Sequence, residues 1–78
     1  MEEGTSLDQL RAGGRALVEE LSAQGPMRRR LQDLGFVTGA QVSCLGNSPL
    51  GDPSAYGVRG AVVALRRRDA RLVKVRPL

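Results

Sequence analysis

Apolar and polar residues alternate along most of the chain, as they do in β-strands with one buried face. The first alternating stretch runs from Arg15 to Leu21, with Ala16 and Val18 on one face. Four more short strands are predicted over residues 40–45, 55–59, 61–66 and 72–76. Arg59-Gly60 is suited to a two-residue hairpin turn between two of them. The pattern therefore predicts a mainly β protein of about five short strands.

One stretch has the spacing of a helix instead. Met27, Leu31 and Leu34 fall at positions i, i+4 and i+7, so a helix over about 26–34 would place all three on one face. A proline suits its first position, and Gly35 is placed to end it in the left-handed conformation. So short a helix needs tertiary packing. We therefore expect these four residues to have structural roles.

The rest of the chain reads as turns and ends. Residues 1–4 are predicted to be a frayed N-terminus, and residues 5–78 to form one domain. Residues 6–9 have the capping-box pattern, which predicts a helical turn with Ser6 at its N-cap. Gly39 and Gly60 are expected to serve backbone geometry at turns. About five strands with one helix after the first predict a small SH3-like β-barrel.

Composition excludes much enzyme chemistry. The sequence has no histidine and a single cysteine, Cys44, so it offers no Cys/His zinc site and no Ser-His or Cys-His nucleophile pair. Its aspartates and glutamates lie at predicted turns and exposed faces, where no buried acid–base pair is expected. The sequence thus predicts a protein that is not an enzyme and needs no cofactor. We expect no metal site either, because Fe²⁺ favours histidine and carboxylate ligands, and the chain has no histidine and only scattered carboxylates.

The chain is expected to be cytoplasmic. Its longest apolar run, from Ala61 to Leu65, is far short of the ~18 residues that a membrane-spanning helix needs. The acidic start, with no apolar segment after it, does not resemble a secretory signal. A lone thiol fits a reducing compartment.

Positive charge is concentrated in the second part of the sequence. Residues 28–78 hold ten basic groups against three acidic ones, and eleven of the twelve basic residues in the chain are arginine. Arginine forks bind carboxylates and phosphates, so an acidic partner such as RNA is one reading and a solvated surface is the other. RNA binding has little support from aromatic residues, since Tyr56 is the one aromatic residue expected to be exposed.

The order and spacing of short motifs across about residues 5–76 resemble the FeoA family, ferrous iron transport protein A. The matching segments are Leu7, Leu10 and Gly13; Arg29, Arg30, Leu31, Leu34 and Gly35; Gly39 and Val42; residues 48–53; Arg59-Gly60; residues 64–66; and Ala70, Val73 and Val75. Ser54 and Gly57 depart from the family pattern, which predicts a weak strand through Tyr56.

The resemblance implies an SH3-like β-barrel and an accessory role in bacterial ferrous iron uptake. It implies a partner, the cytoplasmic part of the FeoB ferrous iron transporter, through which the chain would meet the membrane only indirectly. A weak homo-oligomer is compatible with the sequence. Binding of RNA or another acidic partner by a basic barrel is the alternative function.

Two segments are expected to contact the partner. Arg28 and Arg29 project from the predicted helix, and the predicted loop after the second strand carries Leu50, Gly51 and Asp52. We expect this loop to lie next to the helix. Two questions stay open from the residues alone. Leu50 is either exposed at the loop tip or folded back on the barrel end, and Arg30 is either free or paired with Asp52 or Asp69.

Overall fold

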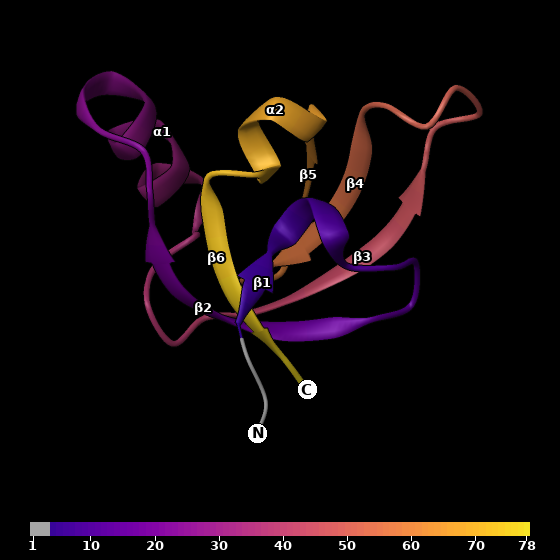
Figure 1. Ribbon diagram of the computed structural model, residues 1–78, viewed down its shortest axis with the longest axis horizontal. Coiled ribbons are helices and arrows are strands. Elements are labelled where there is room, and N and C mark those ends of the chain that lie inside the picture. Colours follow the sequence, from indigo (N-terminus) through magenta and orange to yellow (C-terminus); the bar gives the residue numbers. More distant parts are fainter. Residues whose placement is uncertain (1–3) are drawn as a thin grey trace.

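A computed structural model describes residues 4–78 of the chain. Strands predominate, and the helices are short (Figure 1). The elements in chain order are β1 (Thr5–Ser6), the 3-10 helix η1 (Leu7–Gln9), β2 (Arg15–Leu21), α1 (Gly25–Leu34), β3 (Gln41–Asn47), β4 (Ser54–Val58), β5 (Ala61–Leu65), α2 (Arg67–Ala70) and β6 (Val73–Pro77).

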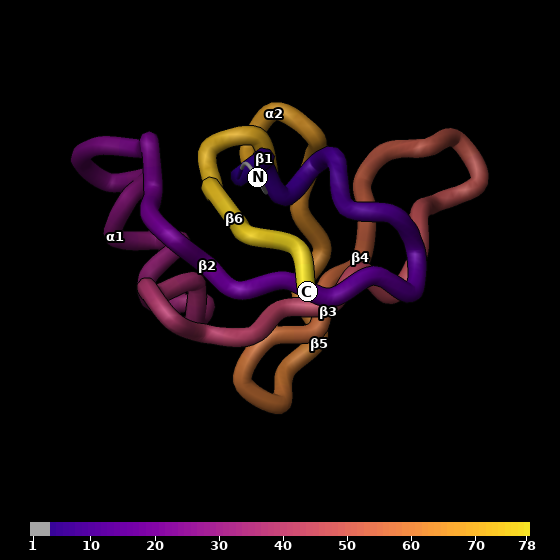
Figure 2. Tube along the Cα trace, turned by 60° about the horizontal axis from the view of Figure 1, so that its bottom comes forward, coloured from indigo at the N-terminus to yellow at the C-terminus, as the bar shows by residue number. Residues whose placement is uncertain are grey.

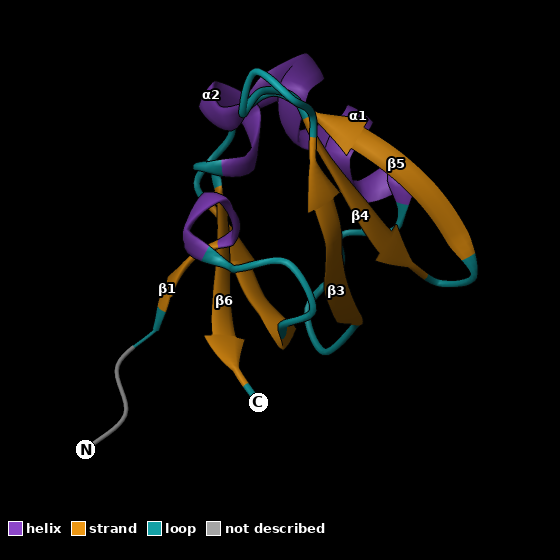
Figure 3. Ribbon diagram, turned by 90° about the vertical axis from the view of Figure 1, so that its right-hand side faces the viewer, coloured by secondary structure: helices purple, strands orange, loops and turns teal. Residues whose placement is uncertain are grey.

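The strands form one antiparallel sheet in the order β1-β6-β2-β3-β4-β5. The sheet is strongly curved, so that β6 and β1 face β3 and β4 across the interior (Figure 3). The ladder ends at β1 on one side and at β5 on the other, which leaves a partly open barrel in the described part of the chain. The predicted mainly β fold is confirmed.

Six strands are present in residues 4–78 where the pattern predicts about five. The additional strand, β1, has only two residues and exists through its pairing with Val75 and Lys74 of β6. A short helix, α2, also lies between the last two strands, where the pattern predicts no helix. Elements of two and four residues carry no periodicity of their own, so alternation along the sequence does not indicate them.

The predicted helical turn near the N-terminus is present as η1, with Ser6 at its N-cap, but the predicted capping box is not. The described structure has only a three-residue 3-10 turn there, and the Ser6 side chain makes no cap hydrogen bond. The Ser6 hydroxyl instead bonds to the carboxylate of Asp8, and the Gln9 amide donates to the same carboxylate. Ser6 is also held by its pairing with Lys74 in the sheet. Ser6 thus ends β1 and begins η1, and the turn forms without the side-chain capping bond.

The core fills the inside of the curved sheet with alternate residues of each strand and the apolar side of the helices. Its largest fully buried side chains are those of Tyr56, Phe36, Leu7, Leu31, Val42, Val58, Val73, Val75 and Cys44. The expectation that Tyr56 is exposed is therefore wrong: only 2% of it is accessible. The strand through Tyr56 is paired on both sides, with β3 and with β5, although Gly57 lies within it.

Helix α1 packs one side against this core. Leu31 is fully buried, whereas Met27 and Leu34 are partly buried against the core. Gly35 ends the helix with φ +114°, and its N–H donates to the carbonyls of Gln32 and Leu31. This left-handed termination turns the chain so that Phe36 enters the core.

Two further turns depend on positive φ angles. Gly39, with φ +89°, donates its N–H to the Val18 carbonyl at 2.8 Å and so joins the segment before β3 to β2. Arg59 and Gly60 both have positive φ in the hairpin between β4 and β5. Positive φ at both central residues characterises the turn that suits the twist of a two-residue hairpin, as predicted for this pair.

Candidate partner-binding surface

The loop between β3 and β4, residues 48–53, is ordered by its own backbone. The Ser48 N–H donates to the Pro53 carbonyl at 3.1 Å, and the Gly51 N–H donates to the Ser48 carbonyl at 2.8 Å. Leu50 lies between these bonds and is 92% exposed. The alternative in which Leu50 folds back on the barrel end is therefore wrong, and an apolar side chain stands in solvent at the loop tip.

Asp52 connects this loop to α2. Its carboxylate accepts a hydrogen bond from the backbone N–H of Arg67 at 2.8 Å. A local backbone partner is the usual one for an aspartate before proline. Here the donor belongs to another element, and the bond holds the end of the loop against the start of α2.

The arginines of α1 are exposed. Arg28 donates from its guanidinium to the Leu21 carbonyl at 3.2 Å, which ties the first turn of α1 to the end of β2. Arg29 and Arg30 are also on the surface. Among residues 4–78 the one ion pair joins Arg76 to Glu19, so pairing of Arg30 with either aspartate is not found.

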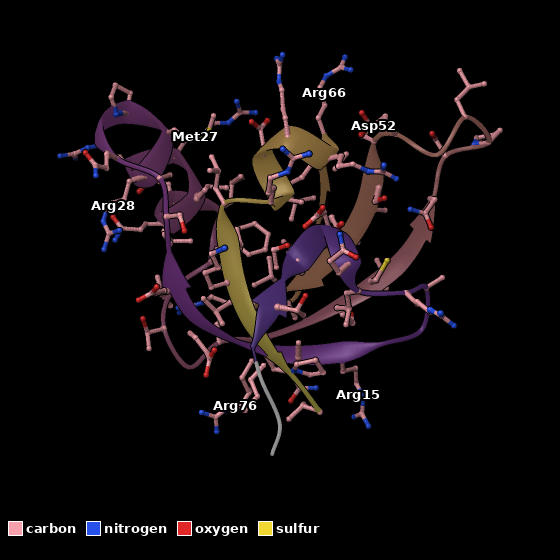
Figure 4. The ribbon with its side chains drawn as sticks, viewed as in Figure 1. Arg15, Met27, Arg28, Asp52, Arg66 and Arg76 are labelled. Atoms are coloured by element: carbon pink, nitrogen blue, oxygen red, sulfur yellow. The ribbon has the colours of Figure 1, made fainter. Side chains whose placement is uncertain are left out.

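The loop and α1 lie on opposite sides of the molecule, with α2 between them (Figures 1 and 2). The expectation that the loop lies next to the helix is therefore wrong. The seven residues of β3 carry the chain from the α1 side to the loop side, a span of about 23 Å for an extended strand. Both segments nevertheless lie on the rim at the same end of the barrel (Figure 1), where Figure 4 shows Arg66 and Asp52 near each other and Arg28 on the outer side of α1.

Helix α2 brings a second group of arginines to this rim, between the two predicted contact segments. Arg66, Arg67 and Arg68 surround its start and Arg71 follows its end, all of them exposed. The first three were visible in the sequence as a triplet. Their position beside the loop follows from sheet topology, which sequence spacing does not indicate.

Metal-binding residues do not gather in the described part of the chain. Across residues 4–78, no three histidine, cysteine, aspartate or glutamate residues come together as a possible ligand set. Cys44 is buried within the core, as befits a small apolar residue on a strand. No helix in the same residues is long and apolar enough to cross a membrane.

The partly open antiparallel barrel, with one helix after its second strand, defines a small SH3-like domain with an arginine-rich rim. The model of the FeoA domain family matches residues 5–77. The chain therefore belongs to the FeoA family, as the motif order suggested.

Solved structures with the same fold include two FeoA proteins. That of Chlorobium tepidum is 40% identical, with a TM-score of 0.88 over 95% of this chain and 70% of its own. That of Stenotrophomonas maltophilia, solved in complex with zinc and described as a prokaryotic SH3 domain protein, is 33% identical. Its TM-score is 0.81 over 91% of this chain and 88% of its own. The SH3-like fold predicted from the sequence is thus confirmed.

A curated relative links the family to a transporter. It is the Fe(2+) transport protein A/Fe(2+) transporter FeoB fusion protein of Porphyromonas gingivalis, 33% identical over 69 residues. The match includes 88% of this chain but only 8% of the fusion protein. In that protein an FeoA part and an FeoB part share one polypeptide, which connects the FeoA family with ferrous iron transport.

Proposed function

We propose that this chain is a non-enzymatic accessory protein of bacterial ferrous iron uptake that binds the cytoplasmic part of an FeoB-type transporter. The observation that carries the proposal is the fusion of the two parts in one relative. Parts joined in one chain are kept at high effective concentration, which favours a functional contact between them. The contact itself would be made at the cytoplasmic side, without a cofactor.

Two segments of the arginine-rich rim are the proposed contacts. Leu50 offers an exposed apolar side chain on an ordered loop, flanked by Gly51 and by Asp52, and such a side chain can be buried in a partner's pocket. Arg28 and Arg29 offer positive charge for acidic groups of the transporter. Because α1 and the loop lie on opposite sides of α2, each segment needs its own test.

The test is capture of the transporter's cytoplasmic domain by the immobilised chain, with and without guanine nucleotide. We expect Leu50→Asp and the double change Arg28→Glu/Arg29→Glu each to weaken capture at least tenfold. Leu78→Asp is the matched control for the first, since Leu78 is also exposed but lies at the other end of the molecule (Figure 1). Unchanged capture by both folded variants would refute the proposed surface.

The alternative, RNA binding by a basic barrel, gains no support from the aromatic residues. The chain has one tyrosine and one phenylalanine, and both are buried. Bases therefore find no exposed aromatic ring on which to stack.

The absence of a specific iron site in this chain is also a prediction that remains to be tested. Anaerobic titration with Fe²⁺ is expected to show no tight stoichiometric binding, and a tight one-to-one complex would contradict this expectation.

A further inference from the structure

Most of the excess positive charge of residues 4–78 lies at one end of the barrel. Seven arginines lie on α1 and around α2, and the same segments with the 48–53 loop contain three aspartates, Asp33, Asp52 and Asp69. The rest of residues 4–78 holds five basic residues and three acidic ones, Asp8, Glu19 and Glu20. This end therefore carries a net charge of 7 − 3 = +4, against 5 − 3 = +2 for the rest of residues 4–78. We call it the arginine end, after Arg28, Arg29, Arg30, Arg66, Arg67, Arg68 and Arg71.

Of the seven guanidinium groups of the arginine end, only that of Arg28 makes a hydrogen bond within residues 4–78, to the Leu21 carbonyl. All seven residues are exposed, and the ion pair found in residues 4–78 is made elsewhere, between Arg76 and Glu19. The Asp52 carboxylate, at the start of α2, accepts the backbone N–H of Arg67, and Asp69 within α2 makes no ion pair in the described residues. Helices α1 and α2 and the loop all lie at the same end of the molecule in two perpendicular views (Figures 1 and 3).

An apolar side chain accompanies this charge. Leu50, 92% exposed, stands at the tip of the loop beside α2. A basic surface next to an exposed leucine fits the boundary between headgroups and acyl chains, where arginines meet phosphates and the leucine leaves water. Nucleic acid would use the arginines but neither needs the leucine nor finds an exposed aromatic ring.

We propose that the arginine end binds directly to anionic phospholipids at a membrane surface, with the arginines on the headgroup phosphates and Leu50 at the level of the acyl chains. Each basic residue near such a surface contributes about fivefold in affinity. This contact would orient the barrel, with α2 toward the lipid and the Arg15 side away from it. It goes beyond the proposed function, and it requires no transporter.

The experiment is co-sedimentation of the full chain with vesicles, in the absence of any transporter. The vesicles are either pure phosphatidylcholine or phosphatidylcholine with about 30% phosphatidylglycerol, in roughly 0.1 M salt. We expect binding to the anionic vesicles only, and its loss in about 0.5 M salt as the surface potential is screened. No binding to anionic vesicles would overturn the proposal.

Paired charge reversals separate the arginine end from net charge. Arg66→Glu/Arg68→Glu is expected to weaken vesicle binding at least twentyfold, since two contributions are lost and replaced by repulsion. Arg15→Glu/Arg76→Glu changes the net charge equally but at the opposite end, where Figure 4 shows both residues. Its effect should be less than threefold.

Equal losses in the two double variants would overturn the proposal, because they would show that total charge alone governs binding. Tighter retention on polyuridylate than on anionic vesicles would also overturn it, in favour of a nucleic-acid surface. Circular dichroism checks that both variants are folded. Capture of the transporter domain is measured without lipid, so failure of either proposal leaves the other result readable.

Discussion

The carboxylate of Asp52 caps a helix that begins at Arg67, fifteen residues further along the chain. The carboxylate accepts the Arg67 N–H at 2.8 Å, whereas the residue at the N-cap itself, Arg66, offers no side-chain acceptor. The first N–H groups of a helix have no partner within it, so a carboxylate there supplies the missing hydrogen-bond acceptor and a favourable negative charge. A loop residue proposed to touch the partner therefore also holds α2 in place.

Replacement of Asp52 tests this bond. We expect Asp52→Ala to lower the free energy of unfolding by about 1 kcal/mol, the usual value of a helix cap, and the melting temperature by roughly 4–8 °C. Thermal unfolding followed by circular dichroism measures the change. Asp52→Asn is the control, because its amide oxygen can accept the same bond, and it should melt close to the unchanged protein. If Asp52→Ala also melted like the unchanged protein, the bond would contribute nothing.

The packing of α1 makes a second prediction. Leu31 is fully buried at the centre of the apolar face of α1. Truncation to alanine removes this packing and leaves a cavity, so Leu31→Ala should cost roughly 2–5 kcal/mol. A protein of this size has about 4–12 kcal/mol in total, so the variant should be marginally stable or unfolded at 37 °C. Urea denaturation gives the difference.

The control for Leu31 lies one turn earlier on the same helix. Met27 is only partly buried against the core, and Met27→Ala has less packing to lose. It should cost clearly less than Leu31→Ala. Equal costs would show that Met27 rather than Leu31 anchors the helix.

Gly35 and Gly39 provide a third, paired prediction. Both have positive φ, +114° and +89°, so alanine is strained at either position by about 1–2 kcal/mol. At Gly35 an added Cβ would also lie 3.1 Å from the Arg59 Cδ and 3.4 Å from the Val58 Cγ2, whereas at Gly39 it would meet nothing within 4 Å. Chemical denaturation should therefore show a larger loss for Gly35→Ala than for Gly39→Ala. Equal losses, or the reverse order, would show that the close approach to Arg59 adds no cost at Gly35.

Long periodic segments are the part of this fold that sequence reasoning predicts well. The alternation around Ala16 and Val18 corresponds to the first seven-residue strand, β2, and the i, i+4, i+7 spacing to α1, within one residue at its start. Each segment is long enough for its own burial pattern to specify its type. The hairpin at Arg59-Gly60 was predictable because its turn chemistry is local.

Features that depend on contacts between distant segments were not predictable in the same way. The two residues of β1 are a strand because β6 lies beside them. The donor to the Asp52 carboxylate is the backbone N–H of Arg67, which lies fifteen residues further along the chain. The burial of Tyr56 depends on β4 lying between β3 and β5. The prediction that α1 and the 48–53 loop lie side by side was wrong for the same reason, because the length of β3 separates them.

Tyr56 gives the last prediction, on the pH dependence of stability. Burial raises the pKa of its phenol above the ordinary value of 10.0, while a hydrogen bond with Ser54 acts in the opposite direction and the nearby Cys44, Asp8 and Asp52 raise it further. The folded state thus holds the phenol proton more tightly than the unfolded state does. The resulting stabilisation is fully present below about pH 10 and is lost as the pH rises from there through the folded pKa. Urea unfolding from pH 8 to 11 should show a fall in the free energy of unfolding that is smaller in Tyr56→Phe, the control that removes the ionisable group but keeps the ring. Parallel curves for the two proteins would show that the Tyr56 phenol ionises as easily in the fold as in water.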